Sequence, residues 1–225
     1  ACVPHTGSGG HFHNDLLAFE AQYDGLDFIV DGGSFEYTGA PAMRDAFRST
    51  AAHSTVVVQG REQRIWPAGP GYLFGVHQDA ATDVLYVAPD ALSLRTEYAD
   101  VRHVRTFTWH GAALVIEDEV TAPAPAGWCI SLHPAVAIAA MTATADAHVI
   151  RLERDGRALV IRLRGVGAPV VAEGWYSSGY GTRVPSSRLL APVHGATATA
   201  TLEFTGARSH ARPPRRVSHA SESMR

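Results

Sequence analysis

The sequence is poor in cysteine, in long apolar runs and in net charge. Its 225 residues include two cysteines, Cys2 and Cys129, so there is no disulfide framework, and their spacing leaves open whether the two pair. No apolar stretch approaches the roughly 20 residues of a membrane-spanning helix, and the N-terminus lacks the basic and apolar regions of a signal peptide. A formal net charge of −3 gives no global electrostatic basis for nucleic-acid binding. We therefore expect neither a membrane nor a nucleic acid as partner.

Helix signals are also scarce, and the pattern is β nearly throughout. Short β-branched and aromatic runs are separated by Gly, Pro and Asp-Gly turns, at a spacing that predicts an all-β antiparallel sandwich with little helix. Asp24-Gly25 and Asp155-Gly156 each predict a tight hairpin, because Asp-Gly readily takes the positive φ angles of a type I′ turn. One helical turn is expected at 40–47. The hairpins are expected at 19–30 and 148–165, and further strands at 53–60, 83–89, 91–98, 101–111, 112–120, 128–136 and 197–204.

The length fits one sandwich domain, which we place at residues 1–207. The polar, Pro/Arg-rich segment 208–225 is expected to be a disordered tail. The chain has no initiating Met, and its N-terminus almost adjoins the densest histidine cluster. We therefore expect the C-terminal piece of a longer protein.

That cluster is "GGHFHND", residues 9–15, and it raises the prospect of metal or proton chemistry. His11 and His13 are two residues apart, so on an extended segment they point the same way. Asp31 ends the first hairpin, and His53 directly precedes a β-branched run. Two imidazoles and a carboxylate suit Zn²⁺ and leave a fourth position for water or substrate. In an unbroken strand His13 and Asp31 would lie on opposite faces, so a shared site requires a bulge or turn before Leu17.

Two other hydrolase groups share parts of this pattern. An H-x-H-x-D run also opens the metal site of metallo-β-lactamase-like hydrolases, but there a His follows the Asp, whereas Leu16 follows Asp15 here. An early H-x-H also suits amidohydrolases, but this sequence has no eightfold βα pattern. The sequence therefore fits these two hydrolase groups less well than it fits a β-sandwich protein.

Residues 9–64 closely resemble the C-terminal β-sandwich domain of the heparinase II/III-like polysaccharide lyases. The resemblance joins the H-x-H-N-D segment, the strand end at "VDGG", the "YTG" turn and the block "RSTAAHSTVVV", and weaker similarity continues to "SSGYGTRVPS". It implies that His11 is the catalytic histidine and that His13, Asp31 and His53 hold a zinc ion. We expect the role of this zinc to be structural rather than catalytic. Gly32 replaces a common Pro, and Ser54 replaces a common Asn, but neither change removes a ligand.

The resemblance also implies a reaction and a missing partner domain. The reaction is β-elimination at a uronic acid, in which a base removes the C5 proton and an acid protonates the leaving 4-oxygen. Family members carry their catalytic Tyr, and the group that neutralises the substrate carboxylate, on an N-terminal (α/α) toroid. We therefore expect this chain to be catalytically incomplete alone and to come from a secreted or periplasmic lyase. The acidic polysaccharide stays open among heparan sulfate, alginate, hyaluronan and a bacterial exopolysaccharide.

Several further residues are candidates for binding that glycan. Arg48, inside the matched block, is the favoured substrate-binding arginine, and Arg44, Arg61 and Arg64 flank it. The alternative is a solvated rim that pairs with Asp45 and Glu62. Tyr180 and Arg183 lie in a Gly-rich stretch expected to be a loop, where they bind substrate or merely pack. His133 is read as structural, and Asn14 and Asp15 either orient the histidines or cap a turn. The rival function is a non-catalytic, zinc-stabilised module that binds acidic glycan or completes a larger assembly.

Overall fold

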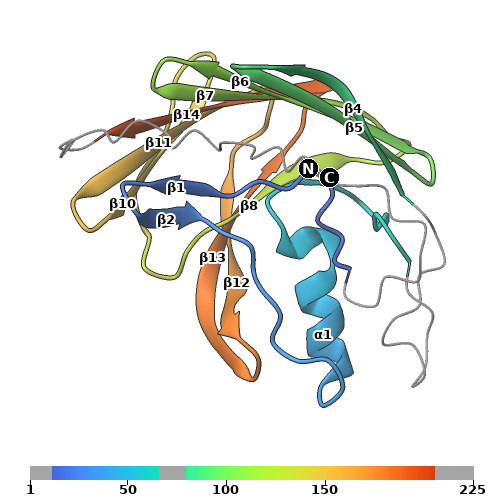
Figure 1. The fold of residues 1–225 in the computed structure, drawn as a ribbon. Helices are drawn as coiled ribbons and strands as arrows, with labels where there is room; N and C mark the ends of the chain where they lie inside the picture. Colours follow the sequence, from blue (N-terminus) through green and yellow to red (C-terminus); the bar gives the residue numbers. More distant parts are fainter. Residues whose placement is uncertain (1–11, 66–79, 206–225) are drawn as a thin grey trace, which may run out of the picture.

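The computed structural model describes residues 12–65 and 80–205, and within them it is an antiparallel β-sandwich with one short α-helix (Figure 1). The tail 208–225, Cys2 and His11 lie outside the described residues. The elements are β1 (Ala21–Tyr23), β2 (Leu26–Ile29), α1 (Pro41–Arg48), the 3₁₀ turn η1 (Thr50–Ala52), β3 (Val56–Val58), β4 (Ala81–Ala88), β5 (Ala91–Tyr98), β6 (Val101–His110), β7 (Ala113–Thr121), β8 (Ala126–Ser131), β9 (Ala137–Ala143), β10 (His148–Arg154), β11 (Arg157–Arg164), β12 (Val170–Gly179), β13 (Thr182–Pro192) and β14 (Thr197–Thr205).

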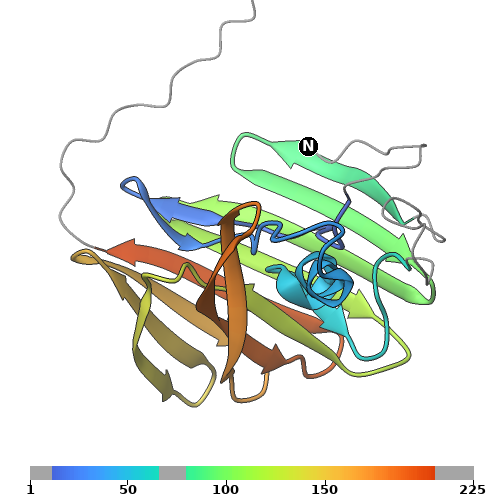
Figure 2. The same cartoon turned by 90° about the horizontal axis from the view of Figure 1, so that it is seen from below.

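Two sheets and a separate hairpin build the sandwich. The larger sheet has eight strands in the order β4-β5-β6-β7-β14-β11-β10-β9, and the smaller has four in the order β12-β13-β8-β3. The β1-β2 hairpin forms a third, two-stranded unit. Figures 1 and 2 show the large sheet arching over the small sheet, the hairpin and α1. The β1-β2 hairpin and α1 thus lie on the same side of the large sheet as the small sheet does.

The core lies between these layers and follows the period-two alternation of the strands. On β7, β11 and β14 every second side chain is buried, as at Ile116, Ile161 and Leu202. Trp128 of β8 and Phe28 of β2 meet them from the opposite layer and are also fully buried. The predicted all-β sandwich is therefore confirmed.

Both predicted Asp-Gly hairpins are confirmed. Tyr23 pairs with Leu26 across Asp24 (φ 52°) and Gly25 (φ 78°), and the 154–157 pair closes over Asp155 (φ 46°) and Gly156 (φ 72°). Positive φ at both turn residues is the type I′ geometry that matches strand twist. The helical turn expected at 40–47 is a full helix, α1, which begins with Pro41 at its first turn.

Three strands were not expected from the sequence: β9, β12 and β13. Strand β9 is Ala-rich and mostly exposed, and β12 and β13 contain Gly, Ser and Pro, so none shows a clean β-branched alternation. Their long antiparallel pairings override the weak local preference. The expected loop around Tyr180 is thus wrong for Arg183, which lies in β13, whereas Tyr180 lies in the tight turn between β12 and β13. Among the described residues, no helix has the length and apolar character needed to cross a membrane.

Candidate metal centre

The segment that carries His13 turns sharply before it enters the first hairpin. Leu17 has a φ of 57°, and the Ala18 N–H donates to the Asp15 carbonyl at 2.9 Å. Leu16 and Leu17 are both buried and anchor this turn in the protein. The turn predicted between His13 and Leu17 is therefore present, and it allows His13 and Asp31 to lie on the same side. Asp15 itself is exposed and caps the turn through its carbonyl.

His53 reaches the same place from the end of α1 and η1. The Asn14 N–H donates to the Arg48 carbonyl at 2.8 Å, which holds the His13 segment beside the C-terminus of α1. The Asn14 amide donates to Glu62 at 2.7 Å, and Glu62 also accepts from the Thr50 N–H and hydroxyl. Asn14 thus ties three segments together and does not contact the histidines through these bonds.

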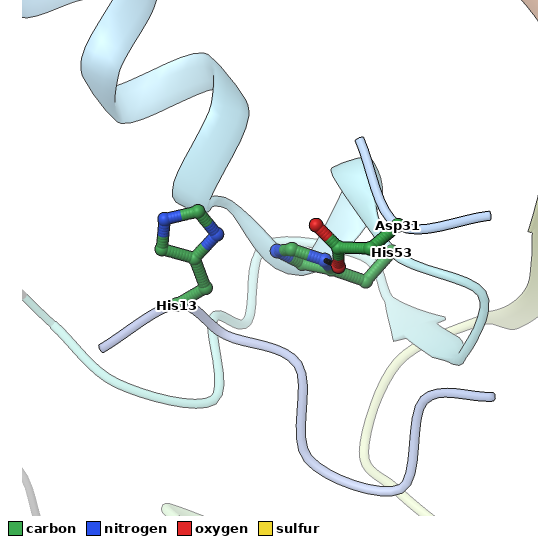
Figure 3. A group of neighbouring side chains, drawn as sticks. All are labelled: His13, Asp31 and His53. Carbon is green, nitrogen blue, oxygen red and sulfur yellow. Dashed lines mark hydrogen bonds and ion pairs between the residues drawn. The ribbon is translucent and has the colours of Figure 1, made fainter. Parts of the chain in front are cut away.

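The three predicted ligands come together in one group (Figure 3). Ligand atoms of His13, Asp31 and His53 all lie within 4.8 Å of one another, so the group could hold a metal ion. His53 Nδ1 lies 2.6 Å from Asp31 Oδ2, and the His13 and His53 rings are 5.3 Å apart. In Figure 3 one nitrogen of each ring faces the other ring, while the carboxylate stands at the far end of His53. Asp31 can therefore serve as a third ligand or orient His53 from behind.

Hydrogen bonds from neighbouring residues fix Asp31 and His13. The Gly33 N–H donates to Asp31 Oδ1 at 2.7 Å, and the Ser34 hydroxyl lies 3.1 Å from His13 Nε2. Gly33 has a φ of 74°, and a Cβ there would lie 2.2 Å from the Ser177 carbonyl oxygen, so only glycine fits. Gly33, the second glycine of "VDGG", thus allows β12 to pack directly against the segment that carries Asp31.

Burial and mutual charge shift two of these groups. Burial lowers the pKa of His13 below its ordinary value and the His53 ring lowers it further, against the opposite effect of Asp31. Burial would raise the pKa of Asp31, but the hydrogen bond and charge of His53 outweigh it, so this pKa lies below its usual range. A neutral imidazole and an ionised carboxylate are the forms that bind metal.

The donor set fits zinc. His53 is fully buried, and its Nε2 has no hydrogen-bond partner among residues 12–65 and 80–205. A buried, unpartnered ring nitrogen is costly unless something binds it. Two imidazoles and a carboxylate are a common zinc ligand set. We conclude that His13, Asp31 and His53 are suited to hold such an ion.

A buried charge cluster behind the site was missed by the sequence analysis. Arg105 of β6 donates twice to Asp118 of β7, each at 2.8 Å, and His103 Nε2 lies 2.6 Å from the same carboxylate. Arg105 also donates to the carbonyls of Leu17 and Ser54, at 2.6 and 3.1 Å. It therefore ties the segments of both ligand histidines to the large sheet. The available signal was strand phase, because Asp118 alternates in register with Leu114, Ile116 and Val120 and must point inward.

The arginines of the predicted rim are mostly engaged within the protein. Arg48 is buried and pairs with Asp45 at 2.8 Å, and Arg44 pairs with the same carboxylate at 3.0 Å. Arg61 pairs with Asp100, and Arg64 donates to the His13 carbonyl. The expected pairing with Asp45 is present, whereas Glu62 bonds Asn14 and Thr50 instead.

His133, Cys129 and the predicted substrate residues of the β12-β13 hairpin are also placed. His133 accepts the Ala135 N–H at Nδ1, as a structural histidine does. Cys129 is buried beside the Ala51 carbonyl, and burial raises the pKa of its thiol to about 11. Arg183 lies over the rings of Trp175 and Phe35. Tyr180 is exposed at the tip of the hairpin.

Comparison with known proteins gives a family. A sequence profile described as "Heparinase II/III-like, C-terminal" matches residues 1–218. The chain belongs to this heparinase II/III-like family. Among solved structures, heparan sulfate lyase HepC from Pedobacter heparinus has a TM-score of 0.65 at 17% identity, with 88% of this chain and 31% of that chain covered. A heparinase III has a TM-score of 0.66 at 14% identity, covering 87% and 30%. No curated protein sequence matches.

The heparinase II/III-like domain thus spans about three-tenths of the length of the solved lyases it resembles. At these identities the structural likeness shows the fold alone. The resemblance stated from residues 9–64 is confirmed by the profile, which covers nearly the whole chain.

Proposed function

We propose that this domain is the sandwich part of a lyase that cleaves a uronate-containing polysaccharide by β-elimination, with zinc held by His13, Asp31 and His53. The observation that carries the proposal is the convergence of the side chains of His13, Asp31 and His53 in one group that could hold a metal ion. Family membership supports the reaction class, and one solved relative is named a heparan sulfate lyase. A secreted or periplasmic location belongs to the same proposal, because polymeric glycans are met outside the cytoplasm.

In this proposal His11 exchanges a proton with the sugar. A base takes the C5 proton, and the electron pair of the broken C5–H bond forms the C4–C5 double bond. The C4–O4 bond breaks as the leaving oxygen takes a proton. His11 lies two residues before His13 in the sequence, so it is joined through the chain to a proposed zinc ligand. Bound zinc would cross-link the three chain segments that carry His13, Asp31 and His53.

The proposal places the remaining catalytic groups on a second domain. We propose that an N-terminal (α/α) toroid of the parent protein supplies them and closes a groove over the sandwich. On the sandwich side, Arg183 and Tyr180 contact the glycan. Arg48 also binds substrate in this proposal, and it lies beside the His13 segment because its carbonyl accepts the Asn14 N–H.

A second candidate is a non-catalytic module that uses the same zinc for stability and binds acidic glycan or completes a larger assembly. It is favoured by one observation, that Arg48, the arginine expected to bind substrate, is buried and paired with Asp45 within the domain. The two candidates differ in whether the full-length parent turns over.

The test uses the full-length parent protein and the ultraviolet absorbance of the unsaturated uronate product. We expect the wild type to form this product from heparan sulfate or alginate, and His11→Ala to lose at least about 100-fold in rate, as for loss of a general acid or base. Metal content should be unchanged in His11→Ala. The control His110→Ala, exposed at the end of β6, should keep full activity. An active parent in which His11→Ala retains full rate would refute the role of His11, and an inactive parent would favour the non-catalytic module.

A further inference from the structure

Arg183 is held in an unusual setting for a surface arginine. Its guanidinium carbon lies 4.2 Å from the centre of the Trp175 ring and 4.9 Å from that of Phe35. One N–H group contacts the Met43 sulfur at 2.9 Å, and a thioether is a weak acceptor. Arg183 forms no ion pair with any carboxylate of the described residues, unlike Arg44 and Arg48. The guanidinium therefore contacts two aromatic rings, while the only hydrogen bond it forms among the described residues is to a weak acceptor.

Exposed aromatic rings continue this setting toward the tip of the hairpin. The Tyr37 and Tyr180 rings stack with centres 5.6 Å apart and an interplanar angle of 21°. Trp175 is 44% exposed and Tyr180 is 62% exposed. A ladder built only for packing would bury these rings, because burial is the source of their stabilising energy. We call Phe35, Tyr37, Trp175, Tyr180 and Arg183 the aromatic strip.

The strip is rigidly joined to the metal group. The Gly181 N–H donates to the Phe35 carbonyl at 2.7 Å, and the Ser177 hydroxyl donates to the Ser34 carbonyl at 2.9 Å. Ser34 also contacts His13 through its hydroxyl. The strip therefore begins at Phe35, directly after Ser34, whose hydroxyl contacts His13, and it continues on the β12-β13 hairpin.

We propose that the aromatic strip is a binding subsite for an acidic sugar residue some distance from the reacting unit of the polymer. The apolar C–H faces of a pyranose ring stack on Trp175 and on the Tyr37–Tyr180 pair. The N–H edge of Arg183 binds the carboxylate or sulfate, for which a planar guanidinium provides two parallel hydrogen bonds. This inference rests on the proposed function, because it takes the acidic glycan of that function as ligand.

Arg183 is well suited to this role because its partners fix it in advance. Contact with two rings removes side-chain freedom that binding would otherwise have to remove. The cation–π contacts also balance part of the charge without blocking the donors. A free lysine would provide neither advantage, and an arginine paired with a carboxylate would have its donors occupied.

Binding of size-fractionated heparan sulfate and of alginate to the whole chain, followed by calorimetry, tests the strip. We expect Arg183→Gln and Trp175→Ala each to weaken binding of one of these glycans at least about tenfold, equal to about 1.4 kcal/mol. Arg183→Gln should also lower the salt dependence of binding, and Arg183→Lys should recover only part of the affinity, because it keeps the charge without the planar fork. Neutral dextran should not bind.

Arg162→Gln is the matched control, because Arg162 is 40% exposed on β11 of the other sheet. It should bind as the wild type does. Near-ultraviolet circular dichroism and metal content show that each variant is folded. The proposal is overturned if folded Arg183→Gln and Trp175→Ala bind normally, if Arg162→Gln weakens binding equally, or if the wild type binds neither glycan.

Kinetics of the full-length parent separate this proposal from the proposed function. If the parent is a lyase, Arg183→Gln should raise KM with little change in kcat, as for loss of an interaction made equally in ground and transition states. A lyase whose KM is unchanged in both strip variants would overturn the strip and leave the function intact. A parent without lyase activity, but with glycan binding that depends on Arg183 and Trp175, would overturn the function and leave the strip intact.

Discussion

His103 is the buried titratable residue with the clearest consequence for stability. Burial lowers the pKa of its ring below 6.5, against the raising effect of the Asp118 carboxylate, and Arg105 adds to the lowering. The ring is therefore neutral in the folded protein and donates through Nε2–H to Asp118, 2.6 Å away. When the protein unfolds, the same ring regains its ordinary pKa.

This difference predicts a fall in stability on mild acidification. Below pH 6.5 the unfolded state binds a proton that the folded state does not, so the free energy of unfolding falls as the pH drops from 6.5 toward the lowered pKa and is level above 6.5. His13, whose pKa is also lowered, acts in the same direction in the metal-free protein. Urea unfolding of metal-free protein at several pH values measures the slope.

His103→Gln is the informative variant, because its amide can still donate to Asp118 but does not titrate. We expect it to remove part of the slope between pH 5 and 6.5 and to leave the part due to His13. An unchanged slope in this variant would show that His103 takes up a proton without unfolding.

At this scale the sequence predicted the convergence of His13, Asp31 and His53 but not the environment behind them. Ligand types at a recognisable spacing can be read locally. The pairing of Arg105 with Asp118 could not be found in the same way, because it depends on the register between β6 and β7. Arg183 was placed in a loop, although its contacts in the structure are with Phe35, which is remote in sequence, and with Trp175 on the paired strand β12.

Among the elements, strand β6 acts on the geometry of the metal group through the side chain of Arg105. Its Arg105 is fully buried, lies over the rings of Phe19 and Trp128, and donates to the carbonyls of Leu17 and Ser54. Ser54 directly follows His53, and Leu17 closes the turn after His13. One side chain of the large sheet thus aligns two segments that are far apart in the sequence.

Arg105→Met tests this alignment. It leaves the buried carboxylate of Asp118 without its main partner, and breaking a buried pair in this way costs about 3–5 kcal/mol. We expect a comparable loss in the free energy of unfolding and at least about a tenfold loss of metal affinity, as for other groups that orient ligands. Denaturant titration and metal competition measure the two effects.

Arg151→Gln is the control, because Arg151 forms an exposed pair with Glu153 on β10, and such pairs contribute little. Metal affinity that stays at the wild-type value in folded Arg105→Met would show that Arg105 stabilises the sandwich without positioning the ligands.

The elements themselves were predicted unevenly, and the reason is local chemistry. The Asp24-Gly25 and Asp155-Gly156 hairpins were predictable because two residues determine the turn and hence the register. Strands β12 and β13 were not, because their stability comes from pairing with each other and with β8 rather than from their own residues. Only a long-range pairing pattern would have shown them.

On the scale of the whole molecule, the metal group joins three segments that lie outside the strands of the sandwich. His13 comes from an irregular segment, Asp31 follows the end of β2, and His53 follows η1. None of the three lies within a strand of the eight-stranded or the four-stranded sheet. Arg105 of β6 donates to the carbonyls of Leu17 and Ser54 and so links the His13 and His53 segments to the eight-stranded sheet. A metal ion would therefore connect segments that otherwise depend on a few hydrogen bonds.

Metal removal should accordingly lower the melting temperature of the whole domain. An ion present at a thousand times its Kd stabilises the folded state by about 4 kcal/mol if it does not bind the unfolded chain. For a domain of this size, each kcal/mol shifts the melting temperature by about 2–4 °C, so chelation should lower it by about 10 °C. Differential scanning calorimetry with and without chelator, with metal content verified by mass spectrometry, measures the shift. His13→Ala should melt near the temperature of the chelated wild type and respond little to chelator, because a half-buried ligand is lost without opening a large cavity. If verified metal removal left the melting temperature of the wild type unchanged, the ion would have no structural role, and the segment that carries His13 would be held by the hydrogen bonds of Arg105 and Asn14 without it.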